Sequence, residues 1–238
     1  SDKLLCYDER QRAGVLDLRY QEVREYLLAV YIKAVREWDL DGLKLDFIDE
    51  FYMREETPVW RAGMDYRDIQ EALDVFMTAV RETLRREKES LLIEFRQRYI
   101  GPNMRRYGNM FRVADCPCSP VTNRVGCVDL RLLCGDSAVH WDMLMWNRGE
   151  RPEEAAMQVL SCLFGVPQIS VRLADIDDGM AEMLRFWLNF MRQHRTLLQM
   201  TVIRAKEPEN LYPEVSVENE TEEILVHYSA GRVIRPAK

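Results

Sequence analysis

Apolar side chains recur along most of the chain in a pattern that predicts alternating helices and strands. The predicted helices cover residues 20–38, 68–89, 122–133, 152–164 and 178–198. The predicted strands cover residues 42–48, 91–95, 109–115, 138–144 and 167–171. Strands that alternate with helices through short connections are typical of a parallel sheet covered by helices, either a barrel or an open doubly wound sheet.

The pattern changes near residue 198. Beyond it, apolar residues such as Val215, Val217, Ile224 and Val226 alternate with polar ones, which predicts antiparallel strands joined by a turn around residues 229–231. The parallel strands before this point are fewer than the eight of a closed barrel. The sequence therefore predicts part of a barrel followed by the beginning of a β domain.

Charge and apolar content narrow the classes of partner. The formal net charge is −7, and the basic residues are scattered rather than gathered in a stripe, which disfavours nucleic acid. No apolar run approaches the length of a membrane span, and the first residues lack the features of a signal peptide. We expect a soluble, cytoplasmic protein that binds neither nucleic acid nor membrane.

The six cysteines could suggest a metal site, but their spacing does not. Cys116 and Cys118 are followed by no second pair at the spacing of a zinc site. Cys127, Cys134 and Cys162 lie among apolar residues, which predicts reduced thiols buried as small hydrophobic groups. We expect no bound metal and no cofactor.

Two carboxylates at the ends of predicted strands are the candidates for chemistry. Asp46 follows Lys44 by two residues in the apolar run 42–48, so alternation places both side chains on one face. Asp115 ends the run 109–115. Two acids from two strands of one sheet fit the requirements of glycosidic-bond cleavage. The structural alternatives are a loop cap for Asp46 and an Asx turn for Asp115.

These residues and their surroundings resemble α-galactosidases of glycoside hydrolase family 36. The segments that carry the resemblance are 15–20, 38–47, 107–112 leading to Asp115, and 140–146. The resemblance implies an α/β fold, a partial (β/α)8 TIM barrel from about the third or fourth strand to the eighth, in residues 1–200. Residues 201–238 would begin the C-terminal β-sandwich domain.

The resemblance also implies roles for single residues. Asp46 would be the nucleophile, Asp115 the acid/base, and Lys44 a contact to the bound sugar that favours the ionised form of Asp46. We expect a raised pKa for Asp115, because it follows an apolar run. The chain departs from the family after the acid/base, where it has Cys116-Pro117-Cys118-Ser119, and at Trp141, where a smaller residue is usual.

The segment around the next predicted strand offers further contacts to substrate. His140 and Asp142 fall on a face that would point towards the same cavity, so both are candidates to bind sugar hydroxyls. A satisfied structural histidine is an equal alternative for His140. Trp141 could stack on a sugar ring, although an aromatic residue in a sheet covered by helices is more often part of the core.

The leading functional hypothesis is therefore a retaining α-galactosidase. It would release terminal α-linked galactose from small oligosaccharides of the raffinose or melibiose type through a covalent galactosyl-enzyme intermediate. Transfer of galactose to another sugar is open within the same chemistry, as is a homo-oligomeric full-length protein.

Two alternatives come from other classes of protein. In an enolase-like enzyme, Asp46, Glu94 and Asp115 would hold a magnesium ion and Lys44 would act as base. The second alternative is a non-catalytic sugar-binding fragment. An incomplete barrel would expose strand edges and apolar helix faces, so we expect the isolated polypeptide to aggregate or to be inactive.

Overall fold

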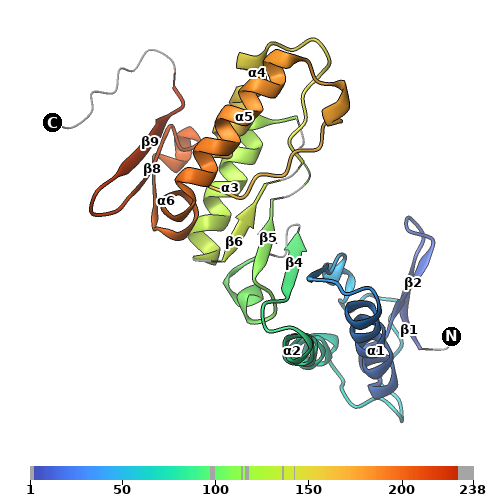
Figure 1. The fold of residues 1–238 in the computed structure, drawn as a ribbon. Coiled ribbons are helices and arrows are strands. Elements are labelled where there is room, and N and C mark those ends of the chain that lie inside the picture. The colour runs from blue at the N-terminus through green and yellow to red at the C-terminus, as the bar shows by residue number, and fades with distance from the viewer. Residues whose placement is uncertain are drawn as a thin grey trace. The chain divides into compact units, whose positions relative to one another are not determined.

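The computed structural model describes residues 3–96, 100–113, 115, 118–135, 137–141 and 143–229. These residues form two compact units (Figure 1). The first unit consists of Ser1–Phe95 with Arg106–Asn109, and the second of Arg96–Arg105 with Met110–Lys238.

The first unit combines an antiparallel hairpin, two long helices and a pair of parallel strands. Strands β1 (Leu4–Asp8) and β2 (Ala13–Leu16) form the hairpin, and β3 (Gly42–Lys44) pairs in parallel with β4 (Leu92–Arg96). The helices are α1 (Gln21–Glu37) and α2 (Ile69–Glu87). The N-terminal hairpin was not expected from the sequence, whereas both helices lie where the apolar spacing predicts them.

The two helices of this unit pack against each other. The α2 helix begins after Asp68, whose side chain accepts a hydrogen bond from the backbone N–H of Gln70 (2.8 Å). Tyr31 of α1 meets Phe76 of α2 with ring centroids 6.2 Å apart. The apolar face predicted for α1 is only partly covered, because Val30 and Trp38 are exposed.

The second unit repeats the order of strand and helix. Strands β5 (Met110–Arg112) and β6 (Ala138–His140) pair in parallel on either side of α3 (Pro120–Cys134) in the chain. Helix α4 (Pro152–Ser161) starts with a proline at its first turn, as expected. The predicted strand 167–171 forms one isolated parallel bridge, Ile169 with Leu144, and Val166 just before it forms another with His140.

The last part of the second unit differs from the predicted single long helix. Helix α5 (Asp178–Gln193) ends at His194, where the backbone leaves helical values (φ −101°, ψ 19°), and α6 (Arg195–Met200) then begins. This break between α5 and α6 directs Leu197 and Leu198 of α6 towards the core, where both are buried. Figure 1 shows α3, α5 and α6 in the same unit as the final strands.

The final strands form an antiparallel sheet, as the alternating pattern predicts. Strand β8 (Glu214–Glu218) pairs with β7 (Ile203–Lys206) and with β9 (Glu223–His227). The turn between β8 and β9 is at Asn219, whose side chain accepts hydrogen bonds from the N–H groups of Thr221 and Glu222. The turn predicted at 229–231 falls mostly outside the described residues.

A buried arginine joins the helices of the second unit. Arg131 of α3 donates hydrogen bonds to the carbonyl oxygens of Phe164 (2.6 Å), Leu198 (2.6 Å) and Thr201 (2.7 Å). Burial lowers its pKa, and the three carbonyl acceptors compensate for the water that the guanidinium loses. The contacts fix the end of α6 and the start of β7 on α3.

The structure thus confirms a mixed α/β fold with parallel strand pairs, helices and a terminal antiparallel sheet. The span of the barrel and a domain boundary near residue 200 stay predictions. No helix among the described residues combines the length and apolar character needed to cross a membrane.

Candidate active-site residues

Asp46 lies just beyond a strand rather than inside one. Strand β3 ends at Lys44, so the predicted strand 42–48 is too long, and the shared face expected for Lys44 and Asp46 does not follow from strand alternation. The Leu45 N–H still donates to the Glu94 carbonyl of β4 (3.0 Å). Asp46 then leaves the sheet half-buried, while Lys44 is exposed.

The backbone turns sharply after Asp46. Phe47 has a left-handed conformation (φ 58°), and its N–H donates to the Asp46 Oδ1 atom (2.9 Å). A left-handed phenylalanine is unfavourable by about 1 kcal/mol, and such residues cluster at functional sites. The short 3₁₀ turn Ile48–Glu50 follows. The turn places the Asp46 carboxylate at the carboxyl end of β3, and its hydrogen bond to Phe47 also agrees with the loop-cap reading.

Asp115 is held by two arginines. Arg112 Nη2 donates to Asp115 Oδ1 (2.6 Å), and Arg96 Nη1 donates to the same oxygen (2.8 Å) and to Oδ2 (3.1 Å). The two arginine side chains are 4% and 14% exposed, whereas that of Asp115 is 65% exposed. The carboxylate is therefore exposed at the surface and contacts two arginine side chains that are mostly buried.

The pKa of Asp115 is shifted in the direction opposite to the sequence-based expectation. The hydrogen bond from Arg112, and then that from Arg96, lower its pKa, although partial burial opposes them. The expected raised pKa is wrong for this structure, because Arg96 and Arg112, at the ends of two strands, donate hydrogen bonds to the carboxylate.

Arg96 and Arg112 are the residues that sequence reasoning missed. Each is the last residue of its strand, β4 and β5 respectively, and follows an apolar residue. A charged residue at the end of an apolar strand is the signal that also identified Asp46 and Asp115 as candidates. It could have been used, but only the fold shows that both arginines reach one carboxylate.

His140 lies on the strand next to the one that leads to Asp115. Its Cα is paired with that of Arg112, and its carbonyl accepts from the N–H of Val113 (3.0 Å). His140 is 5% exposed, and its Nδ1 atom lies 3.0 Å from Gln168 Oε1. His140 and Asp115 thus belong to the same edge of the strand pair, and the role of His140 in binding substrate stays a prediction.

Of the two candidate residues after His140, the structure describes only Trp141. Trp141 is completely buried, and a Cβ atom added to Gly165 would lie only 3.2 Å from its ring. The stacking role considered for Trp141 therefore has no support here, because the indole offers no exposed face and belongs to the core. Asp142 lies outside the described residues.

The cysteines agree with the sequence interpretation where they are described. Cys127, Cys134 and Cys162 are buried, and burial raises the pKa of Cys127 to about 12 and that of Cys134 to about 11. Cys116 lies outside the described residues. Within the described ranges, no group of three or more His, Cys, Asp or Glu side chains is placed to hold a metal ion.

Comparisons with known proteins give fold relatives but no sequence relatives. No protein-family model and no curated protein matches the sequence. Among solved structures, the galactosidase domain of the α-galactosidase-sucrose kinase AgaSK is similar over 100% of this chain, with a TM-score of 0.70 and 14% identity. The GH36 α-galactosidase AgaA from Geobacillus stearothermophilus is similar over 91%, with a TM-score of 0.68 and 16% identity.

A third structure, the α-galactosidase from Lactobacillus brevis, is similar over 91% of this chain, with a TM-score of 0.67 and 14% identity. This chain covers 35%, 31% and 30% of the three solved chains, about a third of their length. At these identities the likeness concerns the fold, and the resemblance seen in the sequence is confirmed at that level: this chain has the fold of about a third of a family 36 α-galactosidase.

Proposed function

We propose that this chain supplies part of the catalytic domain of a retaining glycoside hydrolase that releases terminal α-linked galactose from oligosaccharides. The observation that carries the proposal is the fold likeness to α-galactosidases over 91–100% of the chain. A carboxylate beyond the end of a parallel strand in each unit, Asp46 and Asp115, supports it. Structures of AgaA variants with stachyose and with raffinose suggest the size of the substrate.

In the proposed first step, an Asp46 oxygen attacks the anomeric carbon while Asp115 gives a proton to the leaving glycosidic oxygen. The sugar becomes an ester of Asp46. In the second step Asp115 takes a proton from water, which attacks the same carbon and releases galactose and the free Asp46 carboxylate. Lys44, His140 and Asp142 are proposed to contact the bound sugar.

The two steps require opposite protonation states of Asp115. Ionised Asp115 is the form that the second step needs, and the ion pairs with Arg112 and Arg96 favour it. The first step needs the protonated form, so we propose that a bound substrate raises the pKa of Asp115 by displacing the water that solvates its exposed carboxylate.

The proposal is tested by replacing Asp46 in the natural protein that carries this chain. Asp46→Ala should reduce hydrolysis of p-nitrophenyl α-galactoside by at least about 10³-fold, because no nucleophile remains. Added azide should restore turnover and yield β-galactosyl azide, since it enters from the face that the carboxylate leaves. Asp49→Ala, an exposed aspartate three residues away, is the matched control. Equal activities of the two variants would refute the assignment.

A further inference from the structure

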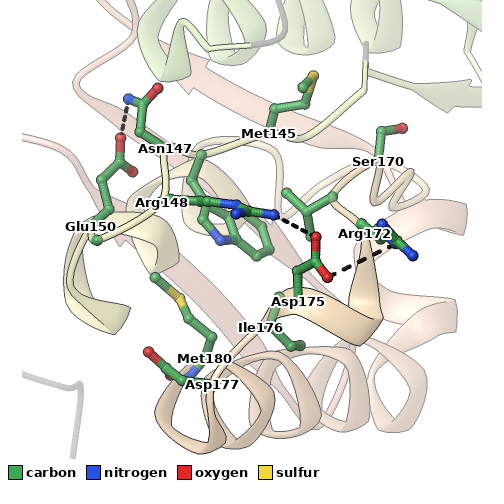
Figure 2. A pocket seen from close by; sticks show the side chains of 13 residues that line it. Met145, Asn147, Arg148, Glu150, Ser170, Arg172, Asp175, Ile176, Asp177 and Met180 are labelled. Carbon is green, nitrogen blue, oxygen red and sulfur yellow. Dashed lines mark hydrogen bonds and ion pairs between the residues drawn. The ribbon is translucent and has the colours of Figure 1, made fainter.

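A pocket of about 540 Å³ with both polar and apolar walls lies within the second unit, and none of the residues assigned above lines it (Figure 2). Its walls are residues 145–150, which follow β6, and residues 170–172 and 175–177, which lead into α5. The parallel bridge between Leu144 and Ile169 joins the two segments just before they diverge. The volume is in the range of small-molecule sites in proteins.

Planar polar groups of the pocket form pairs with one another. Arg148 Nη2 donates to Asp175 Oδ2 (2.6 Å), and Arg172 Nε is 3.9 Å from the other oxygen of the same carboxylate. On the opposite segment, Asn147 Nδ2 donates to Glu150 Oε1 (2.5 Å). Figure 2 shows these paired groups around the hollow. Planar donors and acceptors around a pocket suit a ligand with several hydroxyl groups.

The balance of charge argues against an anionic ligand. The two arginines face three carboxylates in the lining, those of Glu150, Asp175 and Asp177. The N-terminus of α5, which in other barrels could bind phosphate, is capped by Asp177, whose Oδ1 accepts from the Met180 N–H (2.8 Å). These carboxylates would repel a phosphate or a carboxylate ligand, whereas they would not repel a neutral polyol.

Apolar surface completes the lining. Trp146 and Met145 contribute from one segment, and Ile176 and Met180 from the other. A sugar ring presents C–H groups on its faces and hydroxyl groups at its edge, so it needs an apolar surface beside polar groups. An indole with amide, guanidinium and carboxylate neighbours provides both kinds of contact.

The pocket lies on the same edge of the strands as Asp115. Strands β5 and β6 run in parallel, Asp115 follows β5, and residues 145–150 follow β6. In barrels of parallel strands, substrates bind where the carboxyl ends of the strands meet. A ligand in this pocket would therefore be on the side of the unit to which the proposed acid/base belongs.

We infer that this pocket binds a neutral sugar unit of the oligosaccharide beyond the galactosyl group, on the leaving-group side of the scissile bond. The inference rests on the proposed function, because it assigns the pocket to the same substrate. It predicts that Trp146 and Arg148 contribute to recognition of the leaving group.

The test is calorimetric titration of the natural protein with sucrose, which has no galactosyl unit. Trp146→Ala should weaken sucrose binding about tenfold by removing the apolar surface. Arg148→Ala, whose side chain is 88% exposed and so not needed for folding, should weaken it as well. Trp187→Ala on α5, outside the pocket, is the control. Sucrose binding that is absent, or equal in all variants, would overturn the inference, as would binding of inorganic phosphate in its place.

Kinetics separate this inference from the proposed function. The ratio of kcat/KM for stachyose to that for p-nitrophenyl α-galactoside should fall about tenfold in Trp146→Ala relative to Trp187→Ala, because the aryl group replaces the remaining sugars. An unchanged ratio would overturn the inference. Sucrose binding that depends on Trp146, in a protein inactive on both galactosides, would support the sugar site and refute the galactosidase proposal.

Discussion

At the scale of single residues, the two proposed catalytic acids have unlike surroundings. Asp46 accepts a hydrogen bond from the next backbone N–H in a strained turn, whereas Asp115 is paired with Arg96 and Arg112. The arginines favour the carboxylate and disfavour the acid. The pH dependence of cleavage should therefore report on these ion pairs.

Arg112→Gln is expected to move the alkaline limb of the pH profile to higher pH. A general acid must be protonated, so kcat/KM falls as pH rises through its pKa. Arg112 lowers the pKa of Asp115, and its removal lets that pKa rise. The shift should appear with raffinose, whose leaving group needs a proton, more than with p-nitrophenyl α-galactoside. Arg192→Gln, at the exposed end of α5, should leave the profile in place; the same shift there would contradict the account.

A second prediction at this scale concerns stability. Asp17 and Arg19 are completely buried and form an ion pair, and Arg19 also donates to the carbonyl of Pro58 (2.8 Å). Asp17→Ala would leave a buried guanidinium without its carboxylate, so we expect the free energy of unfolding to fall by about 3–5 kcal/mol. Urea unfolding measures this, with exposed Glu9→Ala as control. A loss as small as that of the control would contradict the assignment.

At the scale of elements, helices were predicted better than strands. The period of apolar residues placed α2 and α3 within two residues of their observed ends. The run 42–48 looked like one strand, but Phe47 adopts a left-handed conformation that no periodicity reveals. The hairpin before α1 was missed because its two short strands, LLCYD and AGVL, carry consecutive apolar residues rather than the alternation that marks a half-buried strand.

The contact between α3 and the end of β5 offers a test of how closely α3 packs against the segment that leads to Asp115. A Cβ atom added to Gly126 of α3 would lie 2.5 Å from a methyl carbon of Val113, two residues before Asp115. Gly126→Ala should therefore destabilise the protein by about 1–3 kcal/mol through overpacking, although alanine favours helix.

Gly101→Ala is the matched control, because nothing lies within 4 Å of the added Cβ atom. Thermal unfolding of both variants measures the difference. A stabilised Gly126→Ala protein would show that α3 and β5 are less closely packed than the structure has them.

At the scale of the whole molecule, the sequence predicted the resemblance that the fold comparisons support, although no sequence relative was found. The strand-end acids were visible because carboxylates are rare in apolar runs. Their partners were not, because the ion pairs of Asp115 join residues from separate strands, and the fold alone brings them together. The pocket lined by residues 145–150 could not be predicted from the sequence either, because its walls come from separate segments that only the fold brings together.

The central claim is that Asp46 forms a covalent bond to galactose. It is tested most directly by treating the natural protein with a fluorinated galactosyl donor, which slows the second step, and then identifying the labelled peptide by mass spectrometry. The account predicts one galactosyl ester, on the peptide that contains Asp46, and no label in Asp46→Ala. Label on another carboxylate, or turnover with inversion and no label, would contradict it.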